Sequence, residues 1–426
     1  MHRPQRKWLL GAAALCTLGL MSGAAQAKVK VVFWDKWASG SDYDSITKMV
    51  KAFNASQDQI EVDYQSPGDF LTKFVAAEAG GSPPDIIGSW NHRTGPFAYK
   101  GLIQPIEPLA KASGLDLSVL IPNFRELSRY NGQLYQVPAL PSVITLMWNK
   151  QVFSQAGLDP ETPPAAWADL DAYDKKITQI QADGQIQRVG FSPFFPNWWP
   201  YLWGWLDGGS LWDGDNNAVT ADNPQVVAGY RYIRDLIQRH SQGSAAAFRS
   251  KWGDYMNPFI DGKLGLILMG SWVPTQIASA KDLSYGVAPI PAGPDGEPFS
   301  LLESDTWAIA AGAKHPAEAM QFLKWMYEPA QAKQFAQLRG QFSVVRSVDT
   351  PAFFSEIHSP GTEAFSNVAI GHPAHHAPNM PIWDAYSDAL GKATNDIMAL
   401  KADPGVRLKQ VQQQIAAKWA DLKSGK

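Results

Sequence analysis

The chain carries 17 tryptophans, and several of them stand where loops are expected. A molecule with a flat C–H face and a rim of hydroxyls, such as a sugar, calls for aromatic side chains beside planar polar ones. The chain offers both kinds together, because Asn91, His92 and Arg93 directly follow Trp90. We predict that these three polar residues contact a ligand. The tryptophans that we predict to contact it are Trp37, Trp90, Trp198, Trp199, Trp252 and Trp272.

Plain core packing is the alternative for the central tryptophans. Trp198, Tyr201 and Trp205 would share one face if this segment were helical, and that spacing is also typical of a core. Trp203 and Trp205 therefore stay open between core and site. Trp198 and Trp199 lie among prolines, and this composition favours a loop that contacts a ligand.

Three histidines near the C-terminal end, His372, His375 and His376, could suggest a metal site. No pattern of carboxylates or thiolates completes a ligand set around them. We therefore expect neither a metal nor a cofactor, and we assign His376 to a ligand hydroxyl instead.

Strand and helix patterns alternate from the start of the chain. Residues 29–33 form an apolar run typical of a buried strand, and Ile46, Met49, Val50 and Phe53 then recur at helical spacing. This alternation predicts an α/β fold of parallel sheets covered by helices, with ligands at the carboxyl ends of the strands. Proline-rich joins at 138–141 and 289–298 are expected to mark boundaries between lobes. Further expected elements are helices at 70–75, 226–237 and 408–419 and a strand at 264–269.

The first residues have the pattern of an export signal. Basic residues precede an apolar run at 8–21, and Ala25-Gln26-Ala27 offers a cleavage site, so the mature chain is predicted to begin at Lys28. The apolar run is shorter than the roughly 20 residues that span a bilayer. The sequence therefore predicts a soluble product exported to the periplasm.

Composition excludes several other classes of protein. The single cysteine, Cys16, leaves with the signal, which removes disulfides and thiolate chemistry. Three of the 37 basic residues leave as well, so that 34 basic residues face 40 acidic ones. This balance argues against a nucleic-acid partner, which requires a concentrated basic surface.

Several segments, read in order, resemble the family 1 extracellular solute-binding proteins, the group that includes maltose-binding protein. The resemblance covers nearly the whole mature chain, and the order of the segments carries it more than any single one. The segments are residues 74–85 (FVAAEAGGSPPD), 101–106 (GLIQPI), 131–138 (NGQLYQVP), 148–150 (WNK), 156–158 (AGL), 163–167 (PPAAW), 259–262 (FIDG), 269–272 (MGSW) and 289–291 (PIP).

The resemblance implies a periplasmic-binding-protein-like fold, with two α/β lobes joined by hinge crossings around a ligand cleft. The crossings would lie near residues 138–143, 302–306 and 340–346. Lobe 1 would comprise residues 28–140 plus about 304–342, and lobe 2 would comprise 141–303 plus about 343–426. The resemblance also implies a sugar-like ligand, a monomeric protein and a partner in the membrane permease of an ABC importer.

Charged residues at the crossings complete the predicted site. The resemblance places Glu303, Asp305 and Arg346 facing the cleft, where carboxylates accept hydroxyl donors and a guanidinium donates back. An ordinary ion pair between the lobes is the alternative for these groups. The position of Trp272, just after a strand, commonly stacks on sugar in the family.

Other functions remain open at this point. A secreted carbohydrate-active enzyme would also need aromatic clefts and paired carboxylates, with Asp207, Asp213 and Asp305 as candidates. A polyamine, a polyol or glycerol phosphate are alternative ligands, although Arg93 and Arg346 near the cleft would oppose a cationic one.

Overall fold

The computed structural model describes residues 1, 27–183, 185–193, 198–239, 250–253, 256–357, 359 and 361–425. The predicted export signal lies outside these residues apart from Met1 and Ala27, so it stays a prediction. Among the helices that the structure describes, none has the length and apolar character needed to cross a membrane.

One mixed β-sheet runs through the whole molecule. Its strand order is β2-β1-β3-β13-β6-β11-β8-β7, with β12 paired to β6 and β14 paired to β13. The strands are β1 (Val29–Trp34), β2 (Ile60–Gln65), β3 (Ile86–Trp90), β6 (Val137–Asn149), β7 (Gln179–Ile180), β8 (Ile186–Phe191), β11 (Leu264–Gly270), β12 (Tyr285–Ala288), β13 (Ser300–Ile309) and β14 (Ala374–His375). Two small hairpins are formed by β4 (Arg129–Tyr130) with β5 (Gln133–Leu134) and by β9 (Trp212–Asp213) with β10 (Ala218–Val219).

The expectation of purely parallel sheets is wrong at the centre of the molecule. β1 pairs in parallel with β2 and β3, and β8 with β11, but β13 and β6 pair antiparallel with each other and with β3 and β11. β6 is buried along almost its entire length, which explains its nearly continuous apolar sequence. The two long strands β6 and β13 thus join a parallel group on one side to a second group on the other.

The prolines at 138–141 lie inside β6 and do not interrupt it. The pairing register with β13 shifts here, because Asp305 faces Leu140 whereas Thr306 faces Pro138. Ala139 is therefore the extra residue of a β-bulge, a place where a sheet tolerates proline. A proline-rich segment thus forms part of the sheet, and the lobe boundary expected there stays a prediction.

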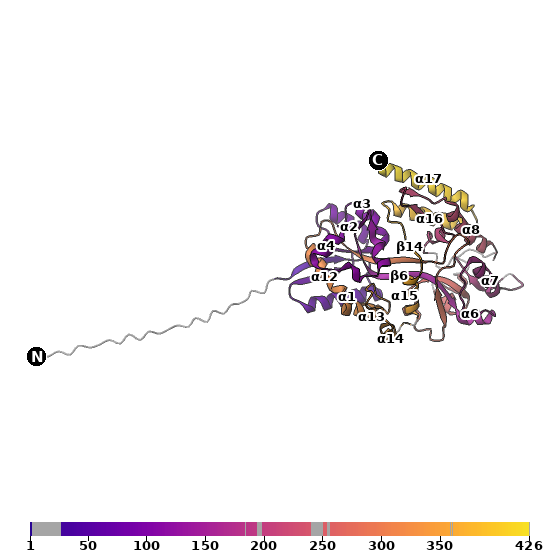
Figure 1. Ribbon diagram of the computed structural model, residues 1–426, viewed down its shortest axis with the longest axis horizontal. Helices are drawn as coiled ribbons and strands as arrows, with labels where there is room; N and C mark the ends of the chain where they lie inside the picture. The colour runs from indigo at the N-terminus through magenta and orange to yellow at the C-terminus, as the bar shows by residue number, and fades with distance from the viewer. Residues whose placement is uncertain are drawn as a thin grey trace.

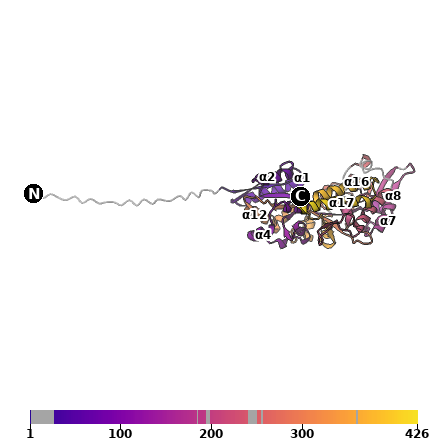
Figure 2. The same ribbon diagram turned by 90° about the horizontal axis from the view of Figure 1, so that it is seen from above.

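Helices cover both groups of strands (Figure 1). Those of the first group are α1 (Gly40–Ser56), α2 (Phe70–Ala79), α3 (Thr94–Tyr99), α4 (Ile106–Ser113), α12 (Pro316–Met326) and α13 (Pro329–Arg339). Those of the second are α6 (Lys150–Gln155), α7 (Trp167–Ile177), α8 (Pro224–Arg239), α10 (Asn257–Ile260), α11 (Val273–Gln276), α16 (Trp383–Met398) and α17 (Pro404–Lys423). Three further helices come between helices of the two groups in the sequence. They are α5 (Pro122–Arg125), α14 (Pro351–Glu356) and α15 (Thr362–Gly371). From above, the helices of the two groups occupy the two ends of an elongated molecule (Figure 2).

Separate hydrophobic cores define two lobes. Lobe 1 is the part built around the core that contains Phe33, Met49 and Trp307. Lobe 2 is the part built around the core that contains Tyr230 and Trp383. The lobe 1 core combines residues 31–140 with 307–357, and the lobe 2 core combines residues 144–301 with 377–419. A third core includes residues from 121–127 and from 143–369, so it ties β6 and β13 to their surroundings. The exact lobe boundaries given above stay a prediction.

The apolar stripes of the expected helices mostly face these cores. All four predicted residues of α1 are buried, and the predicted helices at 226–237 and 408–419 correspond to α8 and α17, each of which buries an apolar stripe. In α2, Phe70, Phe74 and Val75 were expected on one apolar face, but only the two phenylalanines are buried and Val75 is 41% exposed. Periodicity therefore placed these helices correctly but did not fix the width of every buried face.

Candidate ligand-binding cleft

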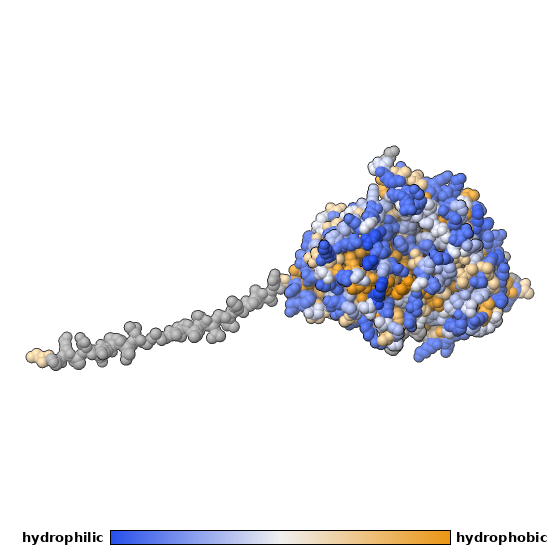
Figure 3. Space-filling model, in the orientation of Figure 1, coloured by the Kyte–Doolittle hydropathy of each residue, from blue (hydrophilic) through white to orange (hydrophobic). Residues whose placement is uncertain are grey.

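A cavity of about 790 Å³ opens where strand ends and loops of the two lobes meet. Its lining is both aromatic and polar, and it comes from β3, β6, β13, α1, α11 and α13 and from the segments that follow β1 and β11. On the face shown in Figure 3, hydrophobic residues gather near the middle with strongly hydrophilic ones among them. The lining residues are Trp37, Ser39, Gly40, Ser41, Asp42, Trp90, Leu140, Ser142, Trp198, Trp199, Trp272, Thr275, Gln276, Glu303, Ser304, Asp305, Arg339 and Gln341.

Strand ends supply most of the aromatic lining. Trp37 follows β1 by three residues, Trp90 ends β3, and Trp272 follows β11 by two residues. Carboxyl ends of parallel strands meet at one edge of a sheet, which places Trp37 and Trp90 together, whereas β11 runs in the opposite direction and brings Trp272 to the cavity from lobe 2. The loop before η4 (Leu202–Trp205) adds Trp198 and Trp199.

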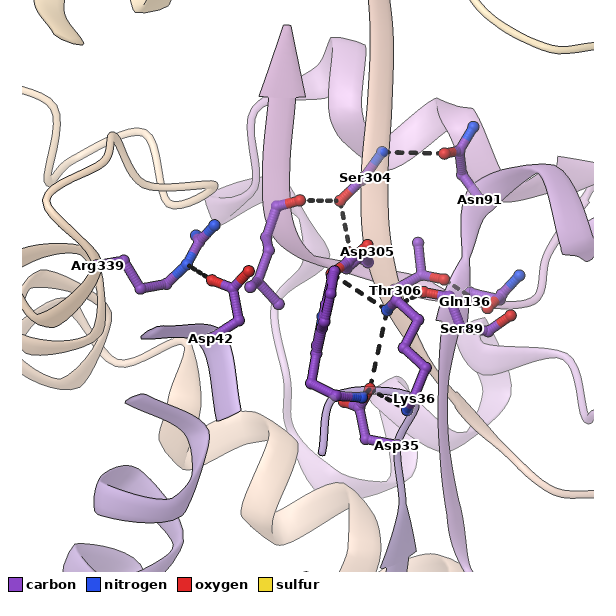
Figure 4. A network of polar contacts seen from close by, with 12 residues as sticks. Asp35, Lys36, Asp42, Ser89, Asn91, Gln136, Ser304, Asp305, Thr306 and Arg339 are labelled. Carbon is purple, nitrogen blue, oxygen red and sulfur yellow. Dashed lines mark hydrogen bonds and ion pairs between the residues drawn. The ribbon is translucent and has the colours of Figure 1, made fainter. Parts of the chain in front are cut away.

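Glu303 and Asp305 lie two residues apart on β13, so both side chains point to the same face of the strand. Asp305 accepts a hydrogen bond from the indole Nε1 of Trp37 at 2.7 Å and pairs with Lys36 Nζ at 3.1 Å. Lys36 Nζ also donates to the carbonyl of Ser89 at 3.0 Å (Figure 4). Lobe 1 therefore brings its own cation to the carboxylate at this end of the cavity.

Lys36 also lies over two indole rings. Its Nζ is 5.1 Å from the ring centroid of Trp37 and 4.9 Å from that of Trp90, within the range of cation–π attraction. A second carboxylate, Asp35, lies 3.8 Å from Nζ and is fully buried. Burial raises the pKa of both Asp35 and Asp305, while the charge of Lys36 opposes the rise. Lys36 is thus the charge that holds this cluster together.

Glu303 has partners of a different kind. It accepts hydrogen bonds from the indole Nε1 of Trp199 at 3.1 Å and from the hydroxyl of Tyr201. Burial raises the pKa of Glu303, and the nearby charge of Asp305 adds to the rise. One strand therefore orients an indole from each lobe through two carboxylates.

The indoles of lobe 2 form a compact group in the cavity wall. Trp198 and Trp272 stack at 6.3 Å between ring centroids with an interplanar angle of 22°, and Trp199 lies 6.1 Å from Trp272. Trp198 is 50% exposed, whereas Trp199 is only 7% exposed. Gly270 makes room for Trp272, because a Cβ at this position would lie 2.0 Å from the indole Cζ3.

A buried ion pair closes the far side of the cavity. Arg339, at the end of α13, donates from Nε to Asp42 at 3.0 Å and from Nη2 to Gln341 at 3.0 Å. Figure 4 shows this pair beside the Lys36 cluster. Asp42 lies in the first turn of α1, where the helix dipole stabilises a negative charge.

The sequence profile of the bacterial extracellular solute-binding proteins matches residues 37–333, well over half of the chain. The chain belongs to this family. A structure of CpMnBP1 with mannotriose bound is similar with a TM-score of 0.77 and 27% identity, over 91% of this chain and 100% of that one. The cyclic alpha-maltosyl-1,6-maltose binding protein from Arthrobacter globiformis is similar with a TM-score of 0.76 and 25% identity, over 92% and 99% of the two chains. The sn-glycerol-3-phosphate-binding periplasmic protein of Pectobacterium atrosepticum is 25% identical over 365 residues, which are 78% of this chain and 77% of that protein.

The cavity of this solute-binding protein contains only some of the predicted site residues. The lining includes Trp37, Trp90, Trp198, Trp199, Trp272, Glu303 and Asp305, and it does not include Asn91, His92, Arg93, Trp252, Arg346 or His376. The open alternative for Trp203 and Trp205 is decided, because both are buried in the lobe 2 core.

The polar residues after Trp90 support the cavity from outside its lining. Asn91 is fully buried and accepts a hydrogen bond from the backbone N–H of Ser304 at 2.9 Å. His92 stacks on Trp90 at 5.7 Å, and burial lowers its pKa to about 3. Arg93 pairs with Asp384 at the start of α16, which links lobe 1 to lobe 2.

The remaining predicted residues lie elsewhere. Trp252 packs against the third core, with Lys251 over its ring. Arg346 is exposed, and His376 contacts the carbonyl of Ala377 through Nδ1 at 2.9 Å. Burial lowers the pKa of His375 to about 4, and within the described part of the chain no cluster of metal-ligating residues occurs.

Sequence reasoning missed the residues whose partners are distant. Lys36 stood next to a predicted tryptophan and could have been found from its place just past β1. Asp42, Arg339 and Gln341 gave no local signal, because their meeting depends on α13 packing against α1.

Proposed function

We propose that this protein is the substrate-binding component of an ABC transporter, which binds a carbohydrate without altering it and delivers it to a membrane permease. The cavity carries the proposal, because five indoles from the two lobes line it together with carboxylates and amides. Flat aromatic faces with polar groups at their edges match the C–H face and hydroxyl rim of a sugar. Proteins of similar structure bind mannotriose and cyclic maltosyl-maltose, which agrees with this ligand class.

The size and chemistry of the cavity are sufficient for useful affinity. Burying roughly 100 Å² of apolar sugar face at about 25 cal/mol/Å² contributes roughly 2.5 kcal/mol, and each net hydrogen bond adds about 1 kcal/mol. Two stacked sugars thus contribute about 5 kcal/mol, and about seven hydrogen bonds would bring the net free energy to about −8 kcal/mol, or micromolar binding, after association costs of about 4 kcal/mol.

We further propose that the ligand stabilises a closed arrangement of the lobes, which the permease recognises. A ligand that contacts both lobes binds the closed form better than the open form and shifts the population toward it. In this proposal the N-terminal signal exports a monomeric protein to the periplasm.

Glycerol phosphate is the second candidate, since a relative of comparable identity binds it. The charges around the cavity disfavour this ligand. Lys36 is paired with Asp305, and Arg339 is paired with Asp42. A phosphate would therefore have to compete with resident carboxylates and would lie close to Glu303 as well.

Titration calorimetry on the mature chain from Lys28 tests the proposal with mannotriose, maltotriose and glycerol 3-phosphate as ligands. We expect one-site binding of a sugar, and chromatography should recover the sugar unchanged. Trp272→Ala should weaken binding, whereas Trp212→Ala, which removes an indole that contacts Trp419 and does not line the cavity, should not. Binding of glycerol 3-phosphate alone would contradict the sugar assignment, and a shortened sugar would contradict a purely binding role.

A further inference from the structure

The two cleft carboxylates of β13 are balanced differently. Asp305 has a cation of the protein beside it, because Lys36 Nζ lies 3.1 Å away. Among the residues that the structure describes, Glu303 receives hydrogen bonds only from neutral donors, the indole of Trp199 and the hydroxyl of Tyr201. Within the described residues, the charge that raises the pKa of Glu303 is the carboxylate of Asp305, which repels it. Glu303 is thus a lining carboxylate whose counter-charge the described part of the chain does not supply.

An unbalanced carboxylate is costly in this place. Removing a charge from water without a partner disfavours the ionised form, and burial raises the pKa of Glu303 accordingly. Filling the cavity with ligand removes further water from this side chain. Neutral hydroxyls donate hydrogen bonds to a carboxylate but leave its charge uncompensated.

The surroundings of Glu303 suit a cationic group. Trp198, Trp199 and Trp272 line the cavity beside it, with ring centroids 5.8 to 6.3 Å apart. Indole faces attract cations, and a carboxylate next to such faces adds a charge-assisted hydrogen bond.

The cations of the cleft do not oppose such a ligand. Arg339 pairs with Asp42 at 3.0 Å, and Lys36 lies between Asp35 and Asp305. Arg93 and Arg346, which the sequence placed near the cleft, lie outside its lining. Two cations, Lys36 and Arg339, therefore face four carboxylates. Of these, Glu303 is the one with no cation of the described residues beside it.

We propose that the carbohydrate bound by this protein carries a protonated amine that pairs with Glu303, which makes the ligand an amino sugar or an oligosaccharide that contains one. This inference rests on the proposed function. It names the class of sugar and the subsite that selects it.

The test compares sugars that differ only at the nitrogen-bearing position. Calorimetry on the full mature chain uses glucosamine, N-acetylglucosamine and glucose, and the β-1,4-linked dimers chitobiose, N,N′-diacetylchitobiose and cellobiose, at a pH where the free amines are protonated. Mannotriose and maltotriose serve as neutral sugars of other geometry. The variants are Glu303→Gln, which keeps the shape and removes the charge, and Asp305→Asn, which removes the carboxylate that already has Lys36.

We expect each amino sugar to bind at least about tenfold tighter than its neutral analogues, because a carboxylate and indole faces both attract a cation. Glu303→Gln should abolish this preference, whereas Asp305→Asn should retain the ratio even where it lowers affinity for all sugars. Near-ultraviolet circular dichroism of Glu303→Gln, compared with the parent, shows whether the indoles keep their packing.

The amine subsite is overturned if the neutral analogues bind as tightly as the amine or more tightly, or if only a neutral trisaccharide binds. Carbohydrate binding itself would still be supported in either case. A preference for the amine that survives in Glu303→Gln overturns the role of Glu303. Failure of every sugar to bind overturns the proposed function and this inference with it.

Discussion

Replacing Gly270 by alanine probes whether Trp272 is an aromatic plate of the site. A Cβ at Gly270 would lie 2.0, 2.2 and 2.5 Å from three carbons of the Trp272 ring, and ordinary contact begins at 3.4 Å. The ring must therefore shift by about 1.4 Å at its nearest atom, because the backbone of β11 is fixed by pairing with β6. Such a shift removes much of the stacking surface that the cavity offers.

The expected effect on affinity follows from that surface. Losing roughly 100 Å² of apolar contact costs up to about 2.5 kcal/mol, which is a factor of about 60 in the dissociation constant. The added methyl group also overpacks the strand, so we expect stability to fall by about 1 to 3 kcal/mol. Calorimetry with the tightest-binding sugar and urea unfolding measure the two effects separately.

Gly286→Ala provides a matched control. A Cβ at Gly286 would lie 2.0, 2.2 and 2.3 Å from carbons of Trp148, so the steric overlap is nearly the same as that at Gly270. Trp148 is only 5% exposed and does not line the cavity. We expect this variant to lose stability to a similar extent and to keep its affinity within about twofold. Unchanged affinity in Gly270→Ala, or an equal loss in both variants, would refute the assignment of Trp272.

Three further predictions follow from single contacts. Trp37→Phe should weaken sugar binding by about one hydrogen bond, roughly fivefold by calorimetry, because Asp305 loses its indole donor while an aromatic ring remains. Asp384→Asn should lower stability by less than about 1 kcal/mol in urea, and the difference should vanish in high salt, because the partner of Arg93 is half exposed. The pKa of His92 is lowered in the folded state, so its contribution to stability is complete above the unfolded pKa near 6.5 and declines as the pH falls below it. When the pH is lowered from 7.5 to 5.5, the parent should lose about 1.4 kcal/mol more of its free energy of unfolding than His92→Gln loses. The control His372→Gln, which replaces an exposed histidine, should lose as much as the parent.

Local pattern predicted only some of the helices and strands that carry the site. The predicted strand at 29–33 and the predicted helix around 46–53 correspond to β1 and α1. In the structure Trp37 and Trp90 lie at the carboxyl ends of β1 and β3, which pair in parallel. Both residues line the cavity for that reason. The mixed character of the sheet was not predictable in this way, because antiparallel pairing of β6 with β13 joins residues that are more than 150 positions apart.

The missed and misplaced residues have a common physical cause. Arg346 and Trp252 carry the right chemistry, but nothing in their neighbourhood in sequence fixes the direction of their side chains. Arg339 enters the lining only through an ion pair with Asp42, 297 residues earlier in the chain. The chemistry of a side chain thus indicates which residues could contact a ligand, but long-range packing determines which of them line the cavity.

The arrangement of the carboxylates on β13 explains why two distant tryptophans can act as one site. Trp37 belongs to lobe 1 and Trp199 to lobe 2, yet both indoles donate to carboxylates of β13. The indole N–H of Trp37 donates to Asp305, and that of Trp199 donates to Glu303. These hydrogen bonds restrict the rotation of both rings before any ligand arrives, which lowers the entropy that binding must overcome. Among the described residues a cation lies beside Asp305 but not beside Glu303. The strand therefore orients both rings, and Glu303 remains to distinguish among ligands. Orientation and selectivity therefore come from the same pair of residues, and the variants Glu303→Gln and Asp305→Asn separate the two effects.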